Sequence, residues 1–236
     1  MRKQFAYIGI LILGLSLVGC DKQVTNSKTV SYPNVAYTSV VCNCPIRISF
    51  CKKATEMIVT AEEHMLNDVR LDCDEKGILT ISIDHLNKQY WEERPWVILP
   101  IPEQLSRLTV YSMASIDADT TLTADKMEWE FSGAVTIDSC ELAVRELSIT
   151  SYSYGTDMHI SGSADKVVME LHSAGYNAFA LETKKYDCTL WNSDANVTCS
   201  NLLLVRNANN STLNYRGDCT VECENALYSS SINRIE

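Results

Sequence analysis

The sequence predicts an all-β protein folded as a parallel β-solenoid, and three features support this: a repeat, a hydrophobic period and a turn composition. Five serine-bearing turns recur at steps of 20, 21, 20 and 20 residues, at Ser112, Ser132, Ser153, Ser173 and Ser193. A fixed period of this length indicates one unit that is copied and stacked, because each copy buries its apolar face only against its neighbours. Between the turns apolar and polar residues alternate, as in Leu147-Ser-Ile-Thr, which is the period of strands.

The repeat length also indicates which kind of solenoid the chain forms. A leucine-rich repeat needs a helical half and an asparagine at a fixed place, and a hexapeptide repeat does not fit a 20-residue period. We therefore expect a β-helix with three short faces per turn, whose coils stack about 4.8 Å apart like strands in any sheet. Serine, glycine and alanine recur at the corners because glycine accepts positive φ and serine can hydrogen-bond the backbone at a bend.

The N-terminus carries the pattern of a lipoprotein signal peptide over residues 1–19. Arg2 and Lys3 precede an apolar run, residues 5–18, which is too short to span a membrane. The run ends at Leu17-Val-Gly-Cys20, where a small residue before cysteine suits cleavage and acylation. We therefore expect Cys20 to carry lipid and to anchor the protein to a membrane. The alternative is an ordinary signal peptide with an incidental cysteine.

Three segments follow the signal peptide. Residues 20–34 are polar and predict a flexible tether, because they offer almost nothing apolar to bury. An N-terminal β section is expected over residues 35–107, and the repeat section over residues 108–236 continues it. Asp74-Glu-Lys-Gly77 marks a turn between two strands, and the polar stretch from His85 to Pro95 marks an exposed loop. The expected strands of the N-terminal section are 36–41, 46–50, 57–61, 69–73 and 78–83.

The ends of a stacked array need protection, because an unpaired edge strand invites association with other chains. Residues 220–236 follow the last repeat and combine Glu222 and Glu224 with many serines and asparagines. We expect this segment to cap the final coil.

The chain is acidic, with a formal net charge of −10. Removal of the signal peptide would also remove Arg2 and Lys3 and make the body more negative. Nucleic acid and anionic lipid headgroups are therefore poor partners, and the charge is better interpreted as a source of solubility.

Several segments resemble one known family. They are the Ser-Gly-Ala-like turns, Gly77-Ile-Leu-Thr-Ile, Trp96-Val-Ile-Leu-Pro-Ile-Pro102, Leu213-Asn-Tyr-Arg-Gly217 and Ser230-Ser-Ile-Asn. Together they are similar to the auto-transporter adhesin head (GIN) domain family over residues 35–236. The resemblance implies a right-handed parallel β-helix, a lipoprotein or secreted protein of Bacteroidetes-type bacteria, and no assigned catalytic residues. The turns at Ser112-Met-Ala-Ser and Asn192-Ser-Asp-Ala depart from the family's Ser-Gly-Ser-Gly form.

Nine cysteines remain beyond Cys20, an odd number that leaves at least one thiol unpaired within the chain. We interpret most of them as small buried apolar residues, and no metal or cofactor is expected. Two alternatives stay open. One is a metal site formed by Cys42, Cys44, Cys51 and His64, and the other is a Cys219 to Cys223 disulfide across a turn.

An enzymatic alternative rests on paired carboxylates, since some β-helix proteins cleave polysaccharides. Asp117 and Asp119 would lie about 7 Å apart on one strand face, a distance that suits a general acid and a general base in catalysis. Asp157 and His159 follow two periods later. No nucleophile motif, HExxH motif or phosphate-binding glycine loop accompanies them. We interpret the aspartates as a solvated acidic face and expect no catalytic residues.

Aromatic residues give the best indication of binding, because tyrosine and tryptophan offer rigid amphipathic contact area. The alternative is that Trp96 is a core residue and that the tyrosines only cap the corners. The candidate binding residues are Tyr90, Trp91, Tyr152, Tyr154 and Tyr176. The sequence thus predicts a non-enzymatic outer-membrane lipoprotein of the cell envelope, an adhesin or scaffold that binds a glycan or a protein. A carbohydrate-active β-helix enzyme and a periplasmic envelope-stress accessory are the alternatives.

Overall fold

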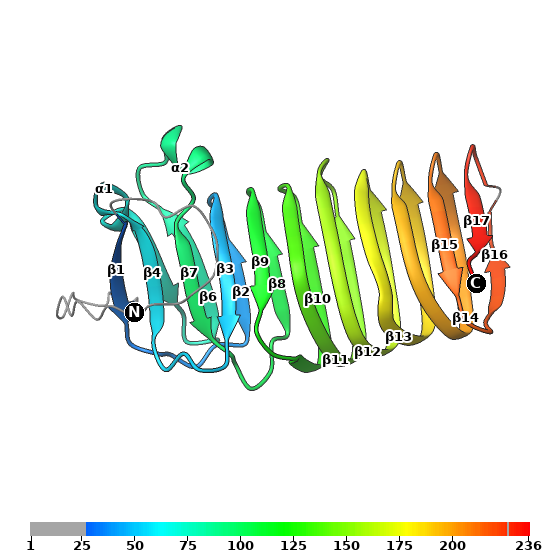
Figure 1. Cartoon of the computed structure of the whole chain (residues 1–236), viewed down its shortest axis with the longest axis horizontal. Helices are drawn as coiled ribbons and strands as arrows, with labels where there is room; N and C mark the ends of the chain where they lie inside the picture. The colour runs from blue at the N-terminus through cyan, green and yellow to red at the C-terminus, as the bar shows by residue number, and fades with distance from the viewer. Residues whose placement is uncertain (1–26, 226) are drawn as a thin grey trace.

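The computed structural model describes residues 27–225 and 227–236, and these form an elongated β-solenoid whose coils follow one another along the long axis (Figure 1). All 17 strands of this part belong to one hydrogen-bonded sheet system. The predicted all-β parallel helix is therefore confirmed. The two helices found there, α1 (Glu63–Leu66) and α2 (Gln89–Glu92), have four residues each. No helix among the described residues is long and apolar enough to cross a membrane.

The strands have the following bounds. The first seven are β1 (Ser27–Tyr32), β2 (Ser39–Cys42), β3 (Ile46–Cys51), β4 (Met57–Glu62), β5 (Val69–Cys73), β6 (Ile78–Ile83) and β7 (Trp96–Pro100). The others are β8 (Arg107–Val110), β9 (Ala114–Ala118), β10 (Leu122–Phe131), β11 (Val135–Ser151), β12 (Thr156–His172), β13 (Ala174–Trp191), β14 (Asp194–Asn209), β15 (Thr212–Arg216), β16 (Thr220–Cys223) and β17 (Ser231–Arg234).

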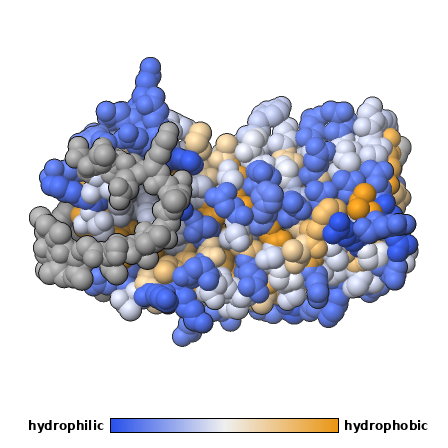
Figure 2. All heavy atoms as spheres, viewed as in Figure 1, coloured by the Kyte–Doolittle hydropathy of each residue, from blue (hydrophilic) through white to orange (hydrophobic). Residues whose placement is uncertain are grey.

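Buried side chains of successive coils stack in columns, because parallel pairing places equivalent residues side by side. One such column consists of Val40, Leu108, Trp129, Ile149, Met169, Cys188 and Val205. Each of these residues is at most 2% exposed. The core is thus a long apolar rod inside the coils. On the face that Figure 2 shows, hydrophilic residues predominate, and hydrophobic residues are visible between them.

Each long strand bends at corners where the inward and outward alternation slips by one residue. In β11, Asp138 and Ser139 both face outwards, and so do Arg145 and Glu146. The pairing register between β11 and β12 shifts near the first of these corners, between Ile137 and Cys140. Two slips and the turn after Ser151 divide the coil into three segments, as expected for a β-helix with three short faces.

The five repeat serines lie at this same turn, which we call the serine corner, but they do not form one column. Ser132 aligns with Tyr152, Ser173 aligns with Asn192, and Ser193 aligns with Ala174. The nearly constant period predicts that the five serines lie in a single column, and this prediction is wrong in register, although the period is correct. The physical reason is turn length: β11 and β12 are joined by four residues, whereas Ser173 alone joins β12 to β13.

A ladder of hydroxyl groups runs inside the serine corner and includes residues that the repeat did not reveal. Ser193 Oγ accepts a hydrogen bond from the Ala174 N–H at 3.2 Å, and Ser211 Oγ accepts one from the Ser193 N–H at 3.1 Å. Ser230 Oγ does the same for the Ser211 N–H at 3.0 Å. The ladder satisfies backbone donors that the tight turn takes out of the sheet.

The N-terminal part has a topology that the order of its strands in the sequence does not predict. β2 pairs in parallel with both β6 and β8, and β3 pairs in parallel with both β7 and β9. The coil formed by β2 and β3 therefore lies between two later coils. β6 and β7 pair with it on the side of the N-terminal end, and β8 and β9 pair with it on the other side. The predicted turn at Asp74 to Gly77 joins β5 and β6, which pair antiparallel.

The flexible tether predicted for residues 20–34 is wrong for residues 27–32, because Ser27–Tyr32 forms β1 and pairs antiparallel with β4. This segment is mostly polar, but its backbone needs to form hydrogen bonds along only one edge, to β4, in order to extend the sheet. Thr29 Oγ1 lies 3.1 Å from Thr60 Oγ1, and Lys28 forms an ion pair with Glu63. Backbone pairing with β4, together with Val30 and Tyr32 packing against the core, thus holds this largely polar segment in the sheet. Residues 1–19 and Cys20 lie outside the described residues.

The expected cap over residues 220–236 is instead a further coil. β16 pairs in parallel with β14, and β17 pairs in parallel with β15. Among the described residues, β16 pairs with no strand other than β14, and β17 with no strand other than β15. The segment can take this form because its backbone fits the register of the preceding coil, so the solenoid ends on an open edge.

Candidate functional site

The structure separates the five predicted binding aromatics. Tyr90 and Tyr176 are core residues with 0% and 1% exposure, so their assignment to a binding surface was wrong. Tyr90 is the buried residue of α2, and its hydroxyl donates to Asp68 Oδ2 at 2.9 Å. Tyr176 occupies an inward position of β13 between Met158 and Ala195, where the small alanine leaves room for the ring.

The remaining three aromatics are exposed but lie in two places. Trp91, 46% exposed, lies on α2 at the N-terminal end of the solenoid (Figure 1). Tyr152 and Tyr154, 55% and 82% exposed, lie in the turn between β11 and β12 at the serine corner. Only these two predicted residues come together.

Tyr152 begins a stack of rings that crosses three coils. The register aligns it with His172 at the end of β12 and with Trp191 at the end of β13. The ring centroids of Tyr152 and His172 are 5.1 Å apart with the planes tilted by 36°. Those of His172 and Trp191 are 6.0 Å apart with the planes 9° from parallel. We call Tyr152, His172 and Trp191 the aromatic stack. It lies on the outside of the solenoid, because each ring follows the last inward residue of its strand.

The column that holds the aromatic stack contains further aromatics beyond a gap on each side. Ser132 aligns with Tyr152 and separates it from Tyr111, which is 53% exposed. On the other side Asn209 aligns with Trp191 and separates it from Tyr228, which is 63% exposed. The rings therefore line one exposed edge of the solenoid, interrupted by two short side chains.

His172, Trp191, Tyr111 and Tyr228 were not among the predicted site residues. A signal for them was present: an aromatic or histidine ring directly precedes the repeat serine at four repeats and lies two residues before it at Ser193. In the structure, the residue at the aligned position before the turn faces outwards. The sequence alone does not reveal this, because a change of one residue in turn length would turn the same side chain inwards. Phe131 shows this, since it directly precedes Ser132 and is fully buried.

Polar groups border the aromatic stack. Glu170 Oε1 lies 3.0 Å from His172 Nε2, and Thr150 and Thr189 flank Glu170 on the neighbouring coils. At the turn itself, Asn210 Nδ2 donates to Asn192 Oδ1 at 2.9 Å. Ser173, Asn192, Asn210 and Ser229 all have positive φ, between 49° and 58°, so the turn holds a fixed, tight shape. The surface thus combines flat rings with carboxylate, hydroxyl and amide groups.

The aspartates of the enzymatic alternative have structural partners. Asp117 Oδ2 accepts a hydrogen bond from Ser49 Oγ at 2.9 Å, and Arg47 Nε lies 3.6 Å from the same oxygen. Asp119 Oδ1 accepts from the Lys52 N–H at 2.8 Å. Asp157 aligns with Thr136, and Thr136 with Ser115, so it lies in a different column from Asp117. The structure therefore uses both carboxylates to join β9 to the β3 coil.

The cysteines form neither alternative arrangement. All nine from Cys42 onwards are free, and no group of three metal-binding side chains gathers within the described residues. Cys51 Sγ contacts Asp119 Oδ2 at 3.1 Å, whereas His64 Nε2 lies 3.1 Å from Gln89 Oε1. Burial is the main cause that raises the pKa of Cys219 to about 11, with the neighbouring Cys199 thiol acting in the same direction.

The comparisons with known proteins identify the family. The family model described as "Putative auto-transporter adhesin, head GIN domain" matches residues 36–219. The chain belongs to this family. No curated protein matches this GIN-domain chain.

Solved structures share its fold at low sequence identity. A crystal structure of a "putative adhesin" from Bacteroides fragilis aligns with a TM-score of 0.71 and 15% identity, covering 89% of this chain and 98% of that one. A "putative adhesin" from Parabacteroides merdae gives 0.61 and 14%, with coverage of 90% and 98%. A "putative lipid binding protein" from Parabacteroides distasonis gives 0.58 and 14%, also with 90% and 98%. At these identities the likeness establishes the GIN-domain solenoid and not a shared ligand.

Proposed function

We propose that this protein is a non-enzymatic adhesin of the bacterial cell envelope, anchored in the outer membrane through lipid on Cys20, and that it binds its partner through the aromatic stack. The observation that carries this proposal is the stack on the outside of the solenoid, in which Tyr152 is exposed and His172 and Trp191 are half-buried. Rigid rings with polar groups at their border are typical of recognition surfaces. Membership in an adhesin family supports the same function.

The anchor can be tested in the native host by replacing Cys20 with alanine in the full chain. We expect the variant to leave the membrane fraction and to keep a mass that lacks the lipid. Unchanged fractionation and unchanged mass would show that Cys20 is not the anchor. Cys223→Ala is the matched control, because Cys223 is an exposed cysteine of the folded body and should not affect anchoring.

Adhesion can be tested with cells that display the full chain and with cells that lack it. We expect the displaying cells to adhere better to mucus-coated or epithelial surfaces, and proteinase treatment of intact cells to remove both the protein and the adhesion. Protection from proteinase on intact cells would favour the periplasmic accessory instead. Polysaccharide cleavage that is lost in an Asp117→Ala, Asp119→Ala double variant would favour the carbohydrate-active enzyme.

A further inference from the structure

We propose that the aromatic stack and the two gaps beside it form a glycan-binding site, and that its ligand is a neutral or amino-sugar chain running along the solenoid axis. This inference rests on the proposed adhesin function and names the partner class and the residues that contact it. The site comprises Tyr111, Tyr152, His172, Trp191 and Tyr228. Ser132 occupies the gap between Tyr111 and Tyr152, and Asn209 occupies the gap between Trp191 and Tyr228.

The stack leaves two ring faces for a ligand. His172 lies between Tyr152 and Trp191, so its own faces are partly covered, and its side chain is 33% exposed. The outer face of Tyr152 is directed along the column towards Ser132, and the outer face of Trp191 towards Asn209. Because aromatic faces carry partial negative charge, they attract the partly positive C–H groups on the flat side of a sugar ring.

The spacing of the column suits such rings. Tyr111 and Tyr152 belong to coils two steps apart, which places their backbones about 9.6 Å from each other. A saturated ring seated between them can touch aromatic carbons on both sides at about 3.5–4.0 Å. Trp191 and Tyr228 have the same separation in coils, so the gap over Asn209 repeats the arrangement. Two equivalent gaps on one axis favour a chain of sugar units over a single small molecule.

The bordering groups match the hydroxyl groups of sugars and disfavour anions. Glu170 can accept hydrogen bonds from hydroxyl or ammonium groups, and Thr150 and Thr189 can donate or accept on either side of it. In the hydrogen bond between Asn192 and Asn210, Asn192 Nδ2 and Asn210 Oδ1 take no part. With Glu170 at the border and a net charge of −10 on the chain, a sulfated or uronic-acid polymer would be repelled.

The test is native gel electrophoresis of the full chain through gels that contain one soluble polysaccharide each: a neutral β-glucan, a mannan, chitosan oligosaccharides or alginate. We expect at least one of the first three to retard the protein, and alginate not to. Trp191→Ala should weaken the retardation about tenfold, the loss expected for one stacked ring, whereas Trp191→Phe should retain most of it. Trp91→Ala is the matched control, since it removes an exposed tryptophan at the other end of the molecule.

A second variant tests the gaps themselves. Ser132→Tyr combined with Asn209→Tyr should fill both gaps, at an exposed and a half-buried position, leave the melting temperature nearly unchanged and abolish retardation. The glycan inference is wrong if no polysaccharide retards the wild-type chain, or if Trp191→Ala is retarded as strongly as wild type with its fold intact. Adhesion of displaying cells to protein-coated surfaces, without any glycan binding, would leave the adhesin proposal standing and remove only this inference.

Discussion

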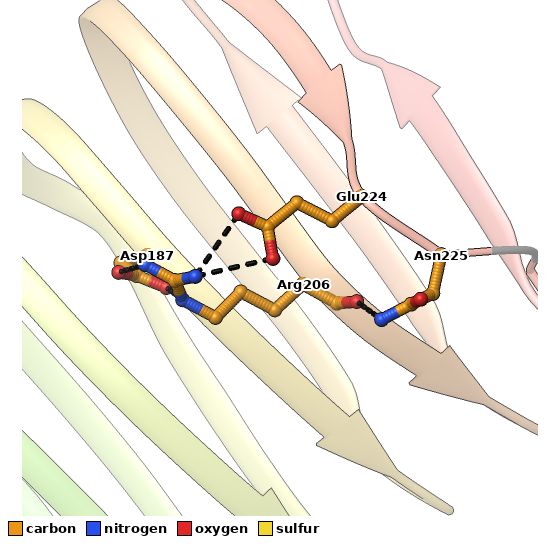
Figure 3. A network of polar contacts seen from close by, with 4 residues as sticks. All are labelled: Asp187, Arg206, Glu224 and Asn225. Carbon is orange, nitrogen blue, oxygen red and sulfur yellow. Dashed lines mark hydrogen bonds and ion pairs between the residues drawn. The ribbon is translucent and has the colours of Figure 1, made fainter.

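Arg206 holds Asp187 of the preceding coil through two hydrogen bonds, from Nε at 2.7 Å and from Nη2 at 2.8 Å (Figure 3). On its other side Arg206 Nη1 lies 3.0 and 3.1 Å from the two carboxylate oxygens of Glu224. One guanidinium thus joins three consecutive coils and ties β16 to the body of the solenoid. A planar fork of donors makes arginine suited to this double pairing.

We expect Arg206→Met to loosen the final coil while the rest of the solenoid stays folded. Limited proteolysis should then cleave the variant within residues 218–236 several times faster than wild type. Arg145→Met is the matched control, because Arg145 pairs with Asp125 in the same two-pronged way but in the middle of the array. Equal cleavage of wild type and Arg206→Met would show that strand pairing alone holds the last coil.

Ser193 provides a test of the hydroxyl ladder. Its Oγ accepts from the Ala174 N–H and donates to the Trp191 carbonyl at 2.8 Å, and the residue is 2% exposed. Ser193→Ala leaves that buried N–H without an acceptor, so we expect a loss of about 1–3 kcal/mol in the free energy of unfolding measured with urea.

Ser193→Thr should restore most of the stability, because Thr156 fills the equivalent position of an earlier coil. Ser153→Ala, at a more exposed serine of the same corner, should have little effect. A Ser193→Ala protein as stable as wild type would contradict the ladder's role.

Gly162 is required at its corner for two reasons. Its φ is +103°, and a Cβ built there would lie 2.0 Å from the carbonyl oxygen of Leu142 on the neighbouring coil. We expect Gly162→Ala to lower the free energy of unfolding by at least about 2 kcal/mol, because it adds backbone strain to a clash with backbone that cannot move aside.

Gly175→Ala is the control for this substitution, since φ there is ordinary and the nearest atom, 3.1 Å away, belongs to the Asp157 side chain. Its effect should be less than about 1 kcal/mol in either direction. Comparable losses in the two variants would rule out the close approach of coils as the cause.

The loop of residues 84–95 should open in acid. The hydrogen bond with His85, assisted by that from the Tyr90 hydroxyl, lowers the pKa of Asp68 below its ordinary value. A lowered carboxyl pKa gives stability that is complete above the unfolded value of about 3.9 and is lost as the pH falls through the folded value. Amide hydrogen exchange, corrected for intrinsic rates, should show residues 84–95 protected at pH 5 and less protected at pH 3.

Asp68→Asn supplies the control for the acid effect. It keeps an acceptor for Tyr90 but cannot titrate, so protection of the loop should no longer change between pH 5 and pH 3. A wild-type loop whose protection is the same at both values would show that Asp68 does not control it.

Much of the fold could be predicted because the information is local and repeated. The alternation around Leu147 and the period of the serines require strands in stacked coils. The aromatic site was predicted only in part: Tyr152 and Tyr154 were placed correctly on the surface, but Tyr90 and Tyr176 were not. Whether a tyrosine near a turn faces in or out depends on the number of residues in that turn, and the repeat does not fix that number.

The sequence by itself thus determined that the protein is a β-solenoid of about 20-residue coils, because periodicity is a property of neighbouring residues. The lipoprotein signal peptide stays a prediction from a short motif at the N-terminus. Only the tertiary structure decided that β2 and β3 lie between later strands, that residues 27–32 join the sheet, and that Tyr152, His172 and Trp191 stack. These depend on the register between coils, which is set by backbone hydrogen bonds and packing between residues about 20 positions apart. A shift of one residue in that register would separate the rings and move the exposed surface to other side chains.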